Sequence, residues 1–207
     1  MSDYFTVKNE ANAEFTEKRS RFIGHIKPVS TREEAEEFIA RKKSEYWDAR
    51  HNVYAYVIRE GNFQKYSDDG EPQGTAGFPA LDVLQKEGVT DCVVVVTRYF
   101  GGVLLGTGGL TRAYSRAAKL ALNAGEKIEM LLCDEMEVAC DYAFYGKLSS
   151  FLPDFGAIVL SADFSENVSV KFAVRKDDCD ILTEKLRDMS NAKFVPQRTG
   201  EGYFAKA

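Results

Sequence analysis

The centre of the chain reads DCVVVVTRYFGGVLLGTGGLTRAYSR from Asp91 to Arg116. The run 93–96 is valine throughout and has no polar alternation, which predicts a strand covered on both faces. Beyond Arg98, Tyr99 and Phe100 the spacing of apolar residues becomes helical from residue 110 to residue 121. A strand, a glycine-rich loop and a helix therefore follow one another here. The loop holds five glycines in nine residues: Gly101, Gly102, Gly106, Gly108 and Gly109.

This order of elements favours an anion site. Glycine allows close backbone approach, and the free amides at a helix start, with the positive end of the helix dipole, point at whatever lies in the loop. Arg98 and Tyr99 end the strand, while Arg112 and Arg116 lie on the first helical turns. We expect an amide-lined hollow ringed by cations. The alternative is a tight turn whose glycines allow close packing of the helix on the strand. The sequence contains neither the dinucleotide-binding motif nor the Walker motif for phosphate binding.

A second loop, from residue 68 to residue 79, carries three carboxylates, three glycines and two prolines. Asp68, Asp69 and Glu71 have two alternative uses. They can bind Mg²⁺ or share a proton, or they can cap the next helix and accept from loop amides. We expect this loop to meet the glycine loop in space. His51 completes the set of candidate ligand-binding residues, and neither a metal site nor a catalytic residue is predicted.

Composition limits the choice of class. The chain has 207 residues with 44% hydrophobic content, enough for one large or two small domains. No stretch approaches the ~18 apolar residues of a membrane span, and no export signal begins the chain, so we expect a cytoplasmic protein with no membrane partner. The four cysteines lack metal-site spacing and are expected to be reduced.

Charge is distributed unevenly along the chain. The net charge is −5, yet residues 1–125 hold 17 Lys and Arg against 17 Asp and Glu, so the excess belongs to the remainder. An acidic chain is not suited to indiscriminate nucleic-acid binding, but a local basic face in the neutral part remains open.

The remaining pattern predicts an α+β protein of two domains, residues 1–126 and 127–207. The first part reads as two strands between residues 13 and 29, a helix near 31–48, a hairpin at 53–67 and a short helix at 80–86. His25 is expected to be a half-exposed strand residue. The second part reads strand, helix, strand, strand, helix, strand, which is the ferredoxin-like arrangement.

Three stretches together resemble the IMPACT family, bacterial YigZ type. They are Lys18-Arg19-Ser20-Arg21-Phe22, the loop from Ser67 to Gly77, and the segment through Val93-Val94-Val95-Val96-Thr97-Arg98-Tyr99-Phe100-Gly101-Gly102. The resemblance implies a first domain like domain 2 of ribosomal protein S5 and a second like the C-terminal domain of elongation factor G. It also implies a link to translation, because eukaryotic relatives regulate translation by competing for a kinase activator.

Three functions fit the sequence. The first is a translation-associated regulator that binds RNA or the ribosome through the Arg- and Gly-rich cleft of the first domain. The second is an enzyme or binder of small anions or nucleotide phosphates, which uses the glycine loop with Asp68, Asp69 and Glu71; its cofactor is not identified. The third is a regulator that docks a protein partner on the same loops. The sequence favours the first.

Overall fold

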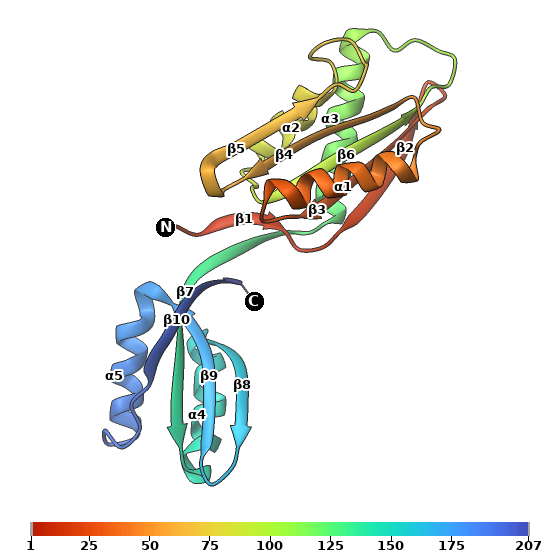
Figure 1. Ribbon diagram of the computed structural model, residues 1–207. Coiled ribbons are helices and arrows are strands. Elements are labelled where there is room, and N and C mark those ends of the chain that lie inside the picture. The colour runs from red at the N-terminus through yellow and green to blue at the C-terminus, as the bar shows by residue number, and fades with distance from the viewer. Residues whose placement is uncertain (1, 207) are drawn as a thin grey trace. The chain divides into compact units, whose positions relative to one another are not determined.

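A computed structural model describes residues 2–206 of the chain. The fold is α+β, and its residues form two compact units: residues 4–129, and residues 130–206 together with residues 2 and 3. We call them the N-terminal unit and the C-terminal unit (Figure 1). Each has its own hydrophobic core, so each is described by itself.

The N-terminal unit is built on a five-stranded antiparallel sheet in the order β2-β3-β6-β4-β5. A short strand β1 (Tyr4–Val7) lies outside this order, and Phe5 bridges to Val89. The sheet strands are β2 (Ala11–Glu17), β3 (Ser20–Pro28), β4 (His51–Ile58), β5 (Phe63–Ser67) and β6 (Cys92–Tyr99), with a single turn η1 (Glu60–Asn62) between β4 and β5.

Helices cover both faces of this sheet. One face packs against α1 (Arg32–Glu45), and the other packs against α2 (Gly77–Lys86) and α3 (Thr107–Ala124). Figure 1 shows α1 on one side and α2 with α3 on the other. The sheet is therefore the middle layer of three, and its central strand β6 is buried from both sides.

The valine run of β6 divides its side chains between two cores. Val93 and Val95 join the core under α1, while Val94 and Val96 join the core under α2 and α3. Successive residues of a strand point to opposite faces, so a strand with a helix layer on each side needs apolar residues at every position. The prediction of a strand covered on both faces is confirmed.

The C-terminal unit is built on four antiparallel strands in the order β10-β7-β9-β8. β1 pairs with β7 and is the fifth strand of this sheet. The unit's elements follow the chain as strand, helix, strand, strand, helix, strand, which confirms the ferredoxin-like prediction. They are β7 (Lys127–Cys140), α4 (Tyr142–Phe155), β8 (Ile158–Phe164), β9 (Val168–Arg175), η2 (Lys176–Asp178) with α5 (Cys179–Met189), and β10 (Gln197–Ala205).

Three local expectations need correction. α3 begins at Thr107, so Gly108 and Gly109 lie in its first turn rather than in a loop. α2 begins at Gly77 rather than at residue 80. Pro79 is tolerated in the first turn because amides there have no hydrogen-bond partner within the helix. His25 is only 1% exposed, since β3 lies second in the sheet and is covered on both faces.

The four cysteines are free. No helix among residues 2–206 is long and apolar enough to cross a membrane.

Candidate functional site

In the N-terminal unit the end of β6, which leads into the glycine loop, meets the loop from residue 68 to residue 79, as the sequence predicts. Nη1 of Arg98, at the end of β6, lies 2.5 Å from Oε1 of Glu71, in the loop before α2. Tyr114 of α3 donates to the same oxygen at 2.8 Å. All three side chains are buried. Burial and the adjacent Glu71 carboxylate raise the pKa of Tyr114, so this hydroxyl remains a hydrogen-bond donor.

The surroundings of Arg98 change the role expected of it. Its guanidinium lies 5.4 Å from the ring centroids of Phe22 and Phe100, and its Nη2 donates to Ser20 at 3.4 Å. The Nε atom is buried without a partner among the described residues. Arg98 is 5% exposed and neutralised by Glu71, so it holds the two loops together instead of standing free on a cation ring.

The carboxylates of Asp68 and Asp69 make hydrogen bonds within the protein. Asp68 accepts from the amides of Gly74, Ala76 and Gly77 at 2.8–3.0 Å, which fixes the entry to α2. Asp69 accepts from the amide of Asn52 at 2.7 Å and from Lys43 at 2.6 Å. These bonds match the alternative in which the carboxylates hold the loop and the start of the next helix, rather than the one in which they bind Mg²⁺ or share a proton. Across residues 2–206 no three His, Cys, Asp or Glu side chains group to hold a metal ion.

His51 lies beside this buried cluster with one ring nitrogen committed. Its Nδ1 lies 2.8 Å from the backbone oxygen of Asp69. A carbonyl oxygen only accepts, so Nδ1 carries a proton and the neutral ring has its lone pair on Nε2. Nε2 lies 3.7 Å from Oε1 of Glu71, which is beyond hydrogen-bond distance.

The glycines of this loop are required for different structural reasons. A Cβ atom on Gly101 would lie 2.0 Å from the carbonyl oxygen of Arg19, so only glycine fits against the β2–β3 turn. Gly102 and Gly106 have φ values of 82° and 73°, a region that glycine enters at little cost. The amides from Gly102 to Gly109 bond to no residue in the described part of the chain.

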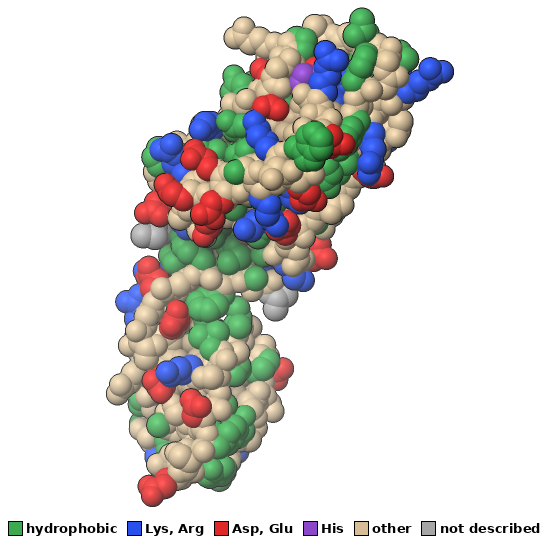
Figure 2. Space-filling view, turned by 45° about the vertical axis from the view of Figure 1, so that its right-hand side comes forward, with side chains coloured by type: hydrophobic (Ala, Val, Ile, Leu, Met, Phe, Trp, Pro, Cys, Tyr) green, Lys and Arg blue, Asp and Glu red, His purple; other side chains and the backbone are tan. Residues whose placement is uncertain are grey.

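Two cavities lie beside the glycine loop, and Leu105 lines both of them. The larger, about 390 Å³, is bounded by Arg50 and His51, by Gly70 to Pro72, and by residues from Arg98 to the start of α3. Figure 2 shows exposed histidine atoms beside Lys or Arg and hydrophobic side chains on this unit.

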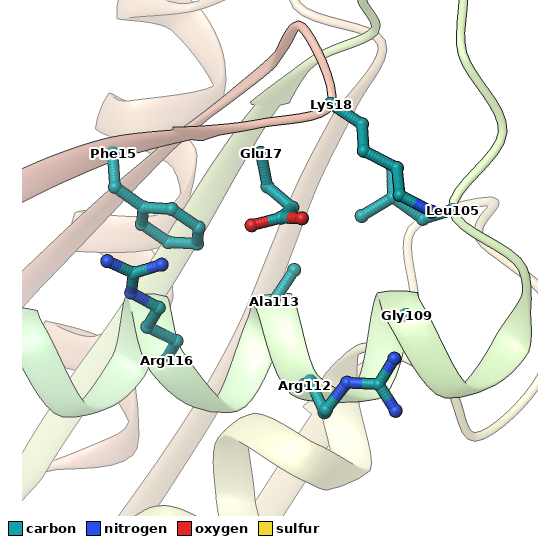
Figure 3. A pocket seen from close by; sticks show the side chains of 8 residues that line it. All are labelled: Phe15, Glu17, Lys18, Leu105, Gly109, Arg112, Ala113 and Arg116. Carbon is teal, nitrogen blue, oxygen red and sulfur yellow. The ribbon is translucent and has the colours of Figure 1, made fainter.

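The smaller cavity, about 270 Å³, lies between the β2–β3 hairpin and α3. Figure 3 shows Lys18 at its upper edge and Arg112 and Arg116 on the helix below. Arg116 lies 4.4 Å from the ring centroid of Phe15.

The sequence-predicted residues are thus only partly brought together. Glu71, Arg98, His51 and Gly106 border the larger cavity, whereas Gly109, Arg112 and Arg116 border the smaller one. Tyr99 is half-buried and donates to Asp48. Sequence reasoning missed Tyr114 as a polar partner because its spacing on α3 is that of a core residue. It predicted Arg50 for RNA contact rather than for the wall of the larger cavity, and it gave Lys18 no role beyond the family resemblance.

Two protein-family models match the chain. The Impact N-terminal domain model matches residues 18–122, and a Domain of unknown function (DUF1949) model matches residues 138–193. The chain is 41% identical over 194 residues to the IMPACT family member YvyE of Bacillus subtilis, covering 93% of this chain and 89% of that protein. The chain belongs to the IMPACT family.

Other relatives agree with this assignment. Identity to the IMPACT family member YigZ of Escherichia coli is 33%, over 84% of this chain and 86% of that protein. Protein IMPACT of Rattus norvegicus is 34% identical over 45% of this chain and 31% of its own length. A solved structure titled as a hypothetical protein matches with a TM-score of 0.61 and 29% identity, covering 96% of this chain and 98% of that one.

Proposed function

We propose that this IMPACT family protein is a translation-associated regulator that contacts RNA through its N-terminal unit. The contact surface is a cationic patch, defined as Lys18, Arg19, Arg112 and Arg116. All four side chains are exposed. None forms an ion pair with a carboxylate among residues 2–206.

The absence of carboxylate partners for these four cations is the observation that carries this proposal. Several other cations of the same unit are compensated: Arg21 pairs with Glu14 at 2.6 Å, Arg41 with Glu10 at 2.7 Å and Lys43 with Asp69 at 2.6 Å. Arg32 and Arg50 are also exposed without a described carboxylate partner, but in the described part of the chain only the patch brings several such cations together. Among the described residues, the cavity that Lys18, Arg112 and Arg116 line holds one carboxylate, that of Glu17 (Figure 3), so the local charge is positive on a unit of balanced composition. Phosphate groups release counterions when such cations approach, which favours RNA over a neutral partner.

The glycine loop adds donors to this surface. Gly101 sits against the backbone of Arg19, so the loop with its free amides begins next to the patch. Backbone amides and arginines both bind phosphate oxygens, and neither requires a particular base. We therefore expect binding governed by the RNA backbone, with weak sequence preference.

Fluorescence anisotropy with a labelled single-stranded RNA tests the proposal. The test variant carries Lys18→Gln, Arg112→Gln and Arg116→Gln. With about 0.7 counterions released per neutralised phosphate, the slope of log affinity against log salt should fall from about 3 to about 1 in magnitude.

The matched control removes the same charge elsewhere through Lys8→Gln, Lys65→Gln and Lys86→Gln, three exposed residues that already hold carboxylate partners. It should keep most of the wild-type slope. Equal slopes in the two variants, or wild-type binding that ignores salt, would reject the cationic patch as the RNA surface.

A further inference from the structure

The larger of the two cavities beside Leu105 has walls of three different kinds. One wall is a buried polar cluster, one is the start of α3 with Arg50, and one is apolar. Its volume of about 390 Å³ falls in the range of small-molecule sites, about 300–1,000 Å³. The apolar wall is formed by Pro72, Phe100, Leu104, Leu105 and Leu110.

The polar wall leaves one acceptor unused on each of two side chains, the buried Glu71 and the half-buried His51. Arg98 and Tyr114 both donate to Oε1 of Glu71, so Oε2 accepts no hydrogen bond within residues 2–206 although the side chain is only 4% exposed. His51 uses Nδ1 on the carbonyl of Asp69, which leaves Nε2 with its lone pair. A ligand with hydroxyl groups would satisfy both acceptors.

The opposite wall favours negative charge. The helix α3 is 18 residues long and starts at this cavity, with Gly106 and Thr107 on the wall and no side-chain cap on its first amides. Arg50 lies 5.8 Å from the ring centroid of Phe100 and forms no ion pair with a described carboxylate. Because Glu71 is balanced by Arg98, the helix dipole and Arg50 make this end of the cavity positive.

We propose that this cavity binds a small organic phosphate with a hydroxylated body. The phosphate lies against the amides of Gly106 and Thr107 and the guanidinium of Arg50. The hydroxyl groups donate to Oε2 of Glu71 and Nε2 of His51, and the body of the ligand covers the apolar wall. The site is separate from the cationic patch, because Leu105 stands between the two cavities.

Isothermal titration calorimetry on the full chain tests this proposal with AMP and ribose 5-phosphate as probes. Adenosine and inorganic phosphate represent the two halves of the ligand. At least one organic phosphate should bind with a Kd below about 1 mM, and each half should bind at least about tenfold more weakly. Failure of both organic phosphates to reach that affinity overturns the proposal, and so does adenosine binding as tightly as AMP.

Two glutamate substitutions on the same helix locate the phosphate. Thr107→Glu places a carboxylate at the cavity wall, where negative charge near a helix start is stabilising, so the variant should remain folded while affinity falls by at least about tenfold. Thr111→Glu adds the same charge one turn later, outside the cavity, and should change affinity less than about twofold. Equal affinity in the two variants overturns the assigned position.

A third variant tests the hydroxyl end. His51→Asn keeps a donor for the carbonyl of Asp69 and removes Nε2. It should weaken the organic phosphates several-fold and leave inorganic phosphate unchanged; an unchanged affinity for the organic phosphates removes His51 from the site. The cationic-patch triple variant should retain full affinity, so this result does not depend on RNA binding.

Discussion

Nη1 of Arg98 lies 2.5 Å from Oε1 of Glu71, and the two side chains are only 6% and 4% exposed. The pair joins the end of the central strand to the loop before α2, two segments 27 residues apart in the sequence. An ion pair so far from solvent is costly to break, because the remaining charge stays buried without compensation.

Glu71→Gln keeps the size of the side chain and removes its charge. We expect the free energy of unfolding of the N-terminal unit to fall by about 3–5 kcal/mol. Native-state hydrogen exchange of the β6 amides measures this change in one unit alone. Glu36→Gln is the control, since its pair with Lys65 is about half exposed and is worth at most about 1 kcal/mol. A similar small loss in both variants would show that the buried pair carries no special weight.

His25 should make the N-terminal unit less stable in acid. Burial and the nearby charge of Lys42 lower the pKa of His25 from 6.5 to about 4. The unfolded chain therefore takes up a proton below pH 6.5 while the folded chain resists until about pH 4. Stability is fully present above pH 6.5 and decreases as the pH falls toward 4, by about 3 kcal/mol.

The comparison with His25→Phe isolates this contribution, because carboxylates that titrate in the same range are common to both proteins. Hydrogen exchange between pH 6.5 and about 4 should show a smaller loss in the variant. Parallel curves for wild type and variant would mean that His25 has an ordinary pKa in the folded chain.

Two glycine-to-alanine substitutions should act in opposite directions. Gly101→Ala sets a Cβ atom 2.0 Å from the carbonyl oxygen of Arg19, so the backbone must move at a cost of about 2 kcal/mol or more. Gly108→Ala meets only Nη1 of Arg112 at 3.5 Å, inside a helix, and should stabilise by up to about 1 kcal/mol. Thermal unfolding of the two variants gives the comparison. Destabilisation by Gly108→Ala would contradict the position of α3.

Asp68→Ala should loosen the loop before α2. The carboxylate accepts three backbone amides, and their loss should cost about 2–4 kcal/mol. Asp68→Asn keeps one acceptor oxygen and should lose about half as much. Proteolysis within the loop, compared at equal temperature, reports the opening directly. Wild-type resistance in Asp68→Ala would mean that other contacts hold this loop.

Much of the fold follows from local sequence. The valine run of β6 has no polar position because helices cover both faces of the sheet, and this requirement is visible residue by residue. The alternation of helices and strands after Gly125 likewise predicts the ferredoxin-like order. Helix starts were less accurate, because a glycine in the first turn and a glycine in a loop have the same local pattern. Gly108 and Gly109 show this limit.

The sequence by itself determined which residues carry charge and which segments must be buried. It named the two loops and some of the residues that border the two cavities, among them Glu71, Arg98 and Arg112. Only the tertiary structure decided that Arg98 is neutralised while Arg112 stays unpaired. The physical reason is that an ion pair depends on distance in space, and the partner of Arg98 is brought to it by a loop from another part of the sheet. His25 illustrates the same point, since its burial comes from a helix layer packed against its strand.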